Sequence, residues 1–326
     1  MIGGVPPLAR REISDRPTMT VRTRHDVHVA KPYRLDLVVS ALRRLSSNVV
    51  DVLTADGQYL RVLAGPRGRA IVRVAQPRDD ALRVTIEGDR RDHAWALACA
   101  RCVLGVDRDL AHFGRAARRV PWLAPLARRM RGIRPPRYPS LWEACVNAIV
   151  FQQVSLQAAS AITRRLIVAL EDRVEHEGVS LYPFPSAEHF LDASDSVLRD
   201  AGLSAGKLAT LRRVGEAITS GALEMAMLEE LTSAEAATAL GQIKGIGPWT
   251  ATVILLRGLG RLDVFPMRDS SVARNLGMVG GPTAIDVPSV LEVLRPQQGM
   301  LYYHLLLARL EARGEVGRAS VAEGVP

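Results

Sequence analysis

The sequence predicts an α+β protein in which a small antiparallel sheet is followed by an all-α region. Short β-prone runs separated by turn residues occupy residues 48 to 86, a pattern typical of antiparallel strands. From residue 141 onward the apolar residues recur with helical spacing in many short segments. A chain of 326 residues with 48% hydrophobic and 24% charged residues has enough material for two or three packed domains.

The sheet domain is expected over residues 29–110. A helix at about 36–45 should precede its strands and another at about 92–104 should follow them, so that helices cover one face. The expected strands are 48–53, 59–63, 70–74 and 81–86. Residues 1–28 carry many Arg, Pro, Thr and Asp residues without a sustained apolar period, so they are predicted to form a mobile basic tail.

The helical region is expected over residues 111–314, followed by a C-terminal tail at 315–326. A proline-rich linker ends just before Ser140, which is a candidate N-cap for the next helix. The expected helices are 141–150, 155–170, 186–193, 194–201, 205–220, 233–240, 248–258, 269–276, 288–294 and 300–311. Many short helices joined by short loops favour an orthogonal array over a bundle of long helices.

Composition narrows the function classes. A formal net charge of +9 favours a polyanionic partner, because clustered cations neutralise phosphates and release counterions. The three cysteines, Cys99, Cys102 and Cys145, are too few for a disulfide framework, and no second pair completes a zinc site. The most apolar stretch, 141–170, is interrupted by Asn, Gln and Arg residues. We therefore expect a cytoplasmic protein, nucleoid-associated if the source is bacterial, without a membrane partner.

A glycine-lined corner between two expected helices is the most informative motif. Gly245 and Gly247 flank a tight turn, and Pro248 stands at the first helical position, where a missing N–H is tolerated. Unpaired amides and the dipole of the following helix would suit a phosphate oxygen there without a side-chain cation. The same tripeptide is also an ordinary tight turn. Its context, between an Ala-rich helix and an amphipathic one, favours the phosphate interpretation.

The motifs around this corner resemble one known family. They are Gly245-Ile246-Gly247-Pro248-Trp249-Thr250-Ala251, Leu256-Arg257-Gly258, Asp263-Val264-Phe265, an Asp twenty residues after the Trp, the segment 148–155, and Leu294-Arg295-Pro296 with Tyr302, Tyr303 and His304. Together they resemble the helix-hairpin-helix DNA glycosylase superfamily, and within it the AlkA-like 3-methyladenine DNA glycosylase type. The resemblance covers about residues 30–312. It implies a TATA-binding-protein-like antiparallel sheet domain followed by all-α helix-hairpin-helix glycosylase domains in two lobes, with the hairpin at about 233–258.

The resemblance assigns the chemistry to Asp269. Breaking an N-glycosidic bond develops positive charge on the sugar, which a carboxylate beside C1′ can stabilise while it helps to position water. Asp269 could also be the N-cap of the helix that follows it, and the two roles are compatible. Asp263, the rival carboxylate, is expected to be structural and to pair with an arginine. Trp249 stands where strand-nicking relatives carry a lysine nucleophile, so no AP-lyase activity is expected.

The implied base pocket consists of Trp249, Val253, Gln297 and Tyr302. Trp249 would stack on an extruded base, where a cationic alkylated purine gains cation–π attraction, although it could also be an ordinary core tryptophan. Val253 and Gln297 stand where relatives carry aromatic residues. The pocket is therefore expected to be less aromatic, and its lesion range could be altered.

Two further segments are implied to contact DNA. The wedge loop contains Gln152, Gln153 and Val154, with Gln153 at the intercalating position and Gln152 as a loop-anchoring amide. The phosphate-binding hairpin is expected to comprise Lys244, Gly245, Ile246, Gly247 and Thr250. The backbone carbonyls of Gly241, Ile243 and Ile246 are candidate ligands for a structural Na⁺ or K⁺. No cofactor is required, and an iron–sulfur cluster is excluded because four cysteines are lacking.

These features predict a monomeric, monofunctional DNA glycosylase that flips out and excises alkylated purines from double-stranded DNA in base-excision repair. Two alternatives stay open. One is a glycosylase of the same fold with another lesion range. The other is a non-catalytic DNA-binding or damage-sensing protein, against which Asp269 argues because phosphate docking does not require it.

Overall fold

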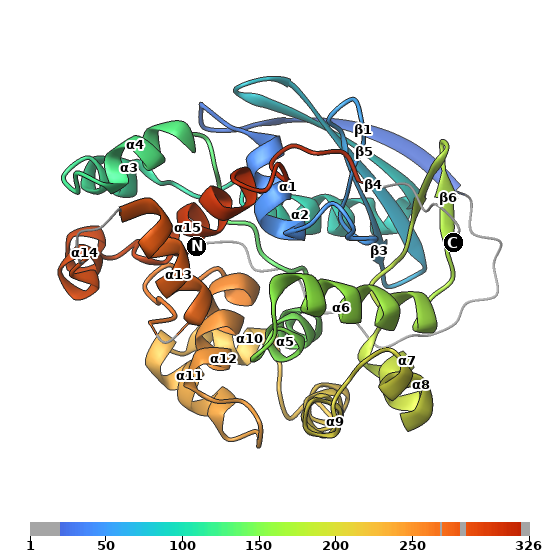
Figure 1. Cartoon of the computed structure of the whole chain (residues 1–326). Helices are drawn as coiled ribbons and strands as arrows, with labels where there is room; N and C mark the ends of the chain where they lie inside the picture. The colour runs from blue at the N-terminus through green and yellow to red at the C-terminus, as the bar shows by residue number, and fades with distance from the viewer. Residues whose placement is uncertain (1–19, 268, 281–284, 321–326) are drawn as a thin grey trace.

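A computed structural model of the chain describes residues 20–267, 269–280 and 285–320. A twisted sheet lies on one side and short helices make up the rest (Figure 1). The strands are β1 (Thr20–His28), β2 (Val52–Leu53), β3 (Tyr59–Ala64), β4 (Arg69–Arg78) and β5 (Ala81–Asp89). They form an antiparallel sheet in the order β1-β5-β4-β3-β2. The predicted α+β class is confirmed.

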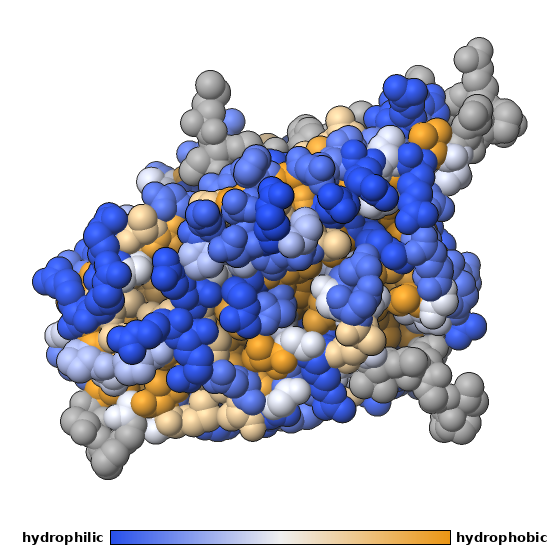
Figure 2. All heavy atoms as spheres, turned by 90° about the horizontal axis from the view of Figure 1, so that it is seen from above, coloured by the Kyte–Doolittle hydropathy of each residue, from blue (hydrophilic) through white to orange (hydrophobic). Residues whose placement is uncertain are grey.

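Two helices belong to the sheet domain. α1 (Leu35–Arg43) follows β1, and α2 (His93–Val103) follows the 3₁₀ turn η1 (Arg90–Asp92). α2 packs against β4 and β5, while α1 contacts α15 (Gly299–Glu311) of the helical region. Both agree with the expected helices to within two residues at each end. Seen from above, the surface is covered mainly by hydrophilic residues with hydrophobic ones showing between them (Figure 2), as is usual for a packed globular protein.

The prediction of a tail over residues 1–28 is wrong for its last part. β1 pairs with β5 along its whole length, from Thr20 opposite Asp89 to His28 opposite Ala81. It is an edge strand in which only one side chain, that of Val27, is fully buried. Because β-branched residues alternate there with charged ones, the strand lacks the apolar period by which buried strands are found. Residues 1–19 lie outside the described residues.

The described part of the predicted C-terminal tail, 315–320, is attached to the sheet domain. The N–H of Ser320 donates to the carbonyl of Leu53 at 2.7 Å, and the N–H of Gly317 donates to the Ser40 hydroxyl at 2.9 Å. Residues 317–320 are therefore bonded to α1 and β2.

The helical region surrounds one buried helix, α5 (Leu141–Val150), which packs against α6, α9 and α12. The other helices are α3 (Ala111–Ala117), α4 (Leu123–Arg129), α6 (Leu156–Leu170), α7 (Ala187–Asp192), α8 (Asp195–Asp200), α9 (Ala205–Thr219), α10 (Met225–Glu230), α11 (Ser233–Gly241), α12 (Pro248–Ile254) with its π-helical continuation η2 (Leu255–Leu259), α13 (Ser270–Gly280) and α14 (Val287–Leu294). None of the helices in the described parts of the chain is long and apolar enough to span a membrane.

Serine caps mark five consecutive helices that were predicted from the sequence. Each helix from α5 to α9 begins behind a serine whose hydroxyl accepts from a first-turn N–H. The unpredicted helices α3, α4 and α10 have no side-chain cap and at most seven residues. The hairpin of β6 (Val174–His176) and β7 (Val179–Leu181) was also not predicted. It packs on the five-stranded sheet, with Leu181 against Val52, Leu60 and Val62.

A buried ionic cluster joins the two regions. Arg61 on β3 is bonded to Asp51 at 2.7 Å and to Glu143 on α5, and the Tyr59 hydroxyl donates to Asp51 at 2.8 Å. All of these side chains are buried. Burial raises the pKa of Glu143 to about 7, with Arg61 opposing the shift and Asp51 adding to it.

Candidate active site

An open cavity lies between the hairpin, the loop after α5, and helices α13 and α15. Its volume of about 800 Å³ is that of a ligand-binding pocket. It is lined by Arg44, Phe151, Gln152, Gln153, Val154, Ser155, Leu156, Gly245, Gly247, Trp249, Thr250, Val253, Asp269, Ser271, Arg274, Asn275, Tyr302, Leu306 and Arg309. Arg44 of the sheet domain and residues of the helical region therefore line the same cavity.

Asp269 stands at the mouth of α13 and faces this cavity. Its Oδ1 accepts from the N–H of Ser271 at 2.7 Å and from that of Val272 at 3.4 Å, so the carboxylate caps the helix. Only 9% of the residue is exposed, and Oδ2 has no hydrogen-bond partner among the described residues. The geometry leaves one oxygen of a fixed carboxylate for a molecule in the cavity.

The predicted pocket residues Trp249, Val253 and Tyr302 also line this cavity. Trp249 and Val253 are four residues apart on α12, a spacing that places them on one face of the helix. The Trp249 Nε1 is buried and has no hydrogen-bond partner in the described part of the chain. Phe151, which was not predicted as a pocket residue, adds a third aromatic ring to the lining. The rings of Phe151, Trp249 and Tyr302 therefore line the cavity together.

Gln297 is a correction, because it does not line the cavity. Its Oε1 accepts from the N–H of Phe113 at 2.8 Å, and its Nε2 donates to the carbonyl of Asp109 at 2.7 Å. The turn between α14 and α15 points the amide toward α3, which it holds in place. Asp263 is exposed, and no arginine pairs with it among residues 20–267, 269–280 and 285–320; its carbonyl accepts from Gln298 at 2.6 Å.

The loop after α5 projects beside the cavity. Gln153 has a φ of 56°, which is unusual for a residue other than glycine and needs support from its surroundings. That support comes from Gln152, whose Nε2 donates to Thr250 Oγ1 at 2.7 Å and to the carbonyl of Gly245 at 3.1 Å. Gln152 therefore anchors the loop to the hairpin, while Gln153 and Val154 are exposed.

The hairpin joins α11 to α12 through a turn that requires glycine. Gly245 has a φ of 105°, and a Cβ there would lie 2.0 Å from Thr210 Oγ1. Gly247 is the N-cap of α12, and no side chain caps the helix, so first-turn N–H groups are available to an anion. Lys244, Gly245 and Gly247 are exposed.

Two residues of the predicted phosphate-binding set point inward. Ile246 is 4% exposed and its N–H donates to the carbonyl of Ile243 at 2.9 Å. Thr250 is 2% exposed and its hydroxyl accepts from Gln152. Their side chains stabilise the corner from behind, so the exposed phosphate surface is narrower than predicted.

The candidate cation site has suitable ligands. Gly241 ends α11, and Ile243 and Ile246 lie in the turn that follows it. Backbone carbonyls suit a hard monovalent cation. The carbonyl of Ile243 already accepts the N–H of Ile246, which leaves it one further lone pair. A Na⁺ or K⁺ ion at these carbonyls stays a prediction.

The cavity lining carries more positive than negative charge. Asp269 is the only carboxylate in the lining within the described residues, against the three arginines Arg44, Arg274 and Arg309. The pKa of Arg309 is lowered by burial and by the neighbouring charges of Arg313 and Arg274, against the attraction of Asp269. Such a lining attracts a polyanion. The cysteines are not part of it: burial raises the pKa of Cys99 to about 12, as expected for a core thiol.

Known proteins share this sequence and fold. Residues 146–295 match the model of the HhH-GPD superfamily base excision DNA repair protein. The chain is 32% identical over 257 residues to the probable bifunctional transcriptional activator/DNA repair enzyme AlkA of Mycobacterium tuberculosis, an alignment that covers 77% of this chain and 50% of that protein. The chain spans about half the length of the curated relatives it matches.

Two solved structures share the fold of most or part of the chain. The 3-methyladenine DNA glycosylase from Archaeoglobus fulgidus superposes with a TM-score of 0.72 at 24% identity, covering 88% of this chain and 99% of that one. The Schizosaccharomyces pombe 3-methyladenine DNA glycosylase in complex with abasic DNA superposes with a TM-score of 0.51 at 26% identity, covering 61% and 97%. Residues 146–295 thus match the HhH-GPD superfamily of base excision DNA repair proteins, and the similar proteins are of the AlkA-like 3-methyladenine DNA glycosylase type.

Proposed function

We propose that this protein is a monofunctional DNA glycosylase that excises alkylated purines, of the 3-methyladenine type, from double-stranded DNA. The observation that carries the proposal is that the helix-capping carboxylate of Asp269 lies with Trp249 and Tyr302 in one positively charged cavity. The names of the similar proteins support the same reaction.

Docking on DNA is assigned to the hairpin. The exposed N–H groups at the start of α12 and the Lys244 ammonium would bind backbone phosphates, with the dipole of α12 contributing. A Na⁺ or K⁺ ion held by the carbonyls of Gly241, Ile243 and Ile246 would add positive charge at the same corner. We expect the protein to act in the cytoplasm as a monomer.

Base extrusion is assigned to the loop after α5. Gln153 projects from that loop in a conformation that Gln152 supports, so its amide would fill the gap in the duplex and hydrogen-bond the orphaned partner base. The extruded base would enter the cavity and stack on Trp249 or Phe151. Damaged bases are favoured because they pair weakly and cost less to unstack.

Bond cleavage is assigned to Asp269. Its free Oδ2 would stabilise the positive charge that develops on the sugar and accept a proton from the attacking water. No lysine lines the cavity among the described residues. Of the three lysines, Lys31 is exposed in the sheet domain, Lys207 donates to the carbonyl of Val150 at 2.8 Å and Lys244 is on the hairpin. A Schiff base is therefore not expected.

Incubation of the wild-type protein with methylated duplex DNA tests the proposal. We expect free methylated purines in solution and a DNA strand that breaks only after alkaline treatment. Borohydride should trap no covalent protein–DNA adduct. A trapped adduct would contradict the monofunctional mechanism, and the absence of released bases would contradict the glycosylase assignment itself.

A further inference from the structure

Arg44 lies in the cavity wall although it belongs to the sheet domain. It follows the last residue of α1 with a φ of 66°, a conformation that costs a residue other than glycine about 1 kcal/mol or more. Its N–H still donates to the carbonyl of Ser40 at 3.0 Å. The backbone therefore turns sharply at this residue, and the surrounding structure has to hold it there.

Arg257 holds the end of α1 in this position. Its Nη2 donates to the carbonyl of Ala41 at 3.0 Å and to that of Leu42 at 2.9 Å. Arg257 is 1% exposed and belongs to η2, directly after the hairpin helix. Arg257 thus holds the backbone just before Arg44 from across the domain boundary.

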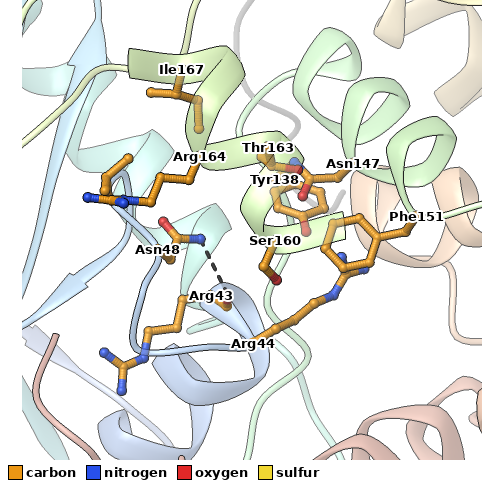
Figure 3. A pocket seen from close by; sticks show the side chains of 11 residues that line it. Arg43, Arg44, Asn48, Tyr138, Asn147, Phe151, Ser160, Thr163, Arg164 and Ile167 are labelled. Atoms are coloured by element: carbon orange, nitrogen blue, oxygen red, sulfur yellow. Dashed lines mark hydrogen bonds between the residues drawn. The ribbon is translucent and has the colours of Figure 1, made fainter. Parts of the chain in front are cut away.

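The Arg44 side chain is nearly buried, and one of its guanidinium nitrogens, Nη1, has no polar partner among the described residues. Its Cζ lies 3.7 Å from the centre of the Phe151 ring, and Figure 3 shows it reaching toward that ring while Arg43 points away. Its Nη1 has no hydrogen bond to any described residue, although Arg44 is only 5% exposed. Arg43 differs, because its guanidinium donates to the Ser320 hydroxyl at 3.0 Å.

A buried guanidinium nitrogen without a partner is costly, because it has lost its hydration without gaining a hydrogen bond. Arg44 and Phe151 line the same cavity as Asp269 and Trp249. A molecule that enters this cavity can therefore supply the missing partner. A backbone phosphate is disfavoured because Arg44 is buried, whereas Lys244 and Arg274 are exposed and available to phosphates.

We propose that Arg44 is a base-recognition residue that donates a hydrogen bond to a carbonyl oxygen or ring nitrogen of an extruded neutral base. This inference rests on the proposed glycosylase function and deepens it, since it assigns to one residue the ability to act on uncharged lesions.

The charge change during cleavage explains why a neutral base needs this residue. When the C1′–N9 bond breaks, its electron pair stays on the base, water oxygen bonds to C1′, and Asp269 takes the water proton. A cationic alkylated purine leaves as a neutral molecule. A neutral base leaves as an anion, which is later protonated by solvent, and the adjacent guanidinium stabilises that anion. The same guanidinium repels a cationic base.

Single-turnover excision by Arg44→Met on two duplexes tests the proposal. One duplex carries 7-methylguanine, a cation, and the other carries hypoxanthine, a neutral base with carbonyl and ring-nitrogen acceptors. We expect the rate for hypoxanthine to fall about 10- to 100-fold, and the rate for 7-methylguanine to rise or to fall no more than about threefold. Arg44→Lys keeps the charge without the planar stack and should give an intermediate hypoxanthine rate.

Arg43→Met is the matched control, because this neighbouring side chain does not line the cavity that contains Asp269. It should leave the ratio of the two rates unchanged. Equal losses on both duplexes in Arg44→Met would overturn the role of Arg44 while leaving the glycosylase function intact. If Arg44→Met loses affinity for undamaged DNA to the same extent as it loses excision rate, Arg44 is a phosphate contact and its role in base recognition is also overturned. A wild-type protein that releases only 7-methylguanine also overturns it, whereas release of neither base removes the proposed function.

Discussion

Arg61 and Arg44 are both buried arginines of the sheet domain, and their surroundings differ sharply. Arg61 contacts two carboxylates, one of them on α5, so its charge is balanced inside the protein. Arg44 has the Phe151 ring beside it and no carboxylate within bonding distance among the described residues. Paired charges join the two regions of the fold, whereas the unpaired one lies where a substrate can enter. The comparison distinguishes Arg61, a buried arginine that stabilises the fold, from Arg44, a buried arginine that is available to a bound molecule.

The largest effect on folding is expected from Arg61→Met. The substitution leaves Asp51 and Glu143 buried without their cation, so the free energy of unfolding should fall by about 3–5 kcal/mol. Arg44→Met removes no hydrogen bond and should change it by about 1 kcal/mol or less. Urea denaturation followed by circular dichroism measures both. Equal destabilisation by the two substitutions would remove the distinction drawn between these arginines.

Gly245→Ala should be the next most damaging change. The new Cβ would collide with Thr210 in a backbone conformation that alanine avoids, and we expect a loss of about 2–4 kcal/mol in unfolding free energy. Gly247→Ala is the matched control, since a Cβ there has nothing within 4 Å. Thermal unfolding of both proteins checks this. A larger effect at Gly247 would show that the corner is not held as described.

The cluster around Arg61 should also make stability depend on pH. The folded-state pKa of Glu143, about 7, lies above its ordinary value of 4.5, so the folded protein binds this proton more tightly than the unfolded chain. The contribution of this proton to the free energy of unfolding is complete below about pH 4.5 and is lost as the pH rises through about 7. We expect a decrease of about 1–3 kcal/mol for the wild type. Glu143→Gln should not show this decrease in unfolding free energy between about pH 4.5 and about pH 7.

A smaller effect is expected from Gln152→Ala, which removes the two hydrogen bonds that tie the loop to the hairpin. Stability should fall by about 1 kcal/mol. Excision should slow by roughly tenfold, because Gln153 is then less well held. Gln157→Ala, an exposed change on the neighbouring helix α6, serves as the control. An unchanged excision rate in Gln152→Ala would show that base extrusion does not depend on this anchoring of the loop.

The sequence predicted the parts of the molecule that carry a local signal. Serine caps and apolar periods identified most of the helices, and the contiguous hairpin motif located Trp249 and Asp269. β1 was missed because an edge strand buries few side chains. Arg44 and Phe151 could not be assigned to the cavity, because they meet only after α1 packs against the helical region, a contact fixed by Arg257.

The most direct test of the central claim is single-turnover base release from methylated duplex DNA by Asp269→Asn. Asparagine is an equally good helix N-cap, so α13 and DNA binding should be preserved while the carboxylate charge is lost. We predict that the rate of base release falls by at least about 100-fold, with unfolding free energy and DNA affinity close to those of the wild type. Release at the wild-type rate would contradict the assignment of catalysis to this cavity.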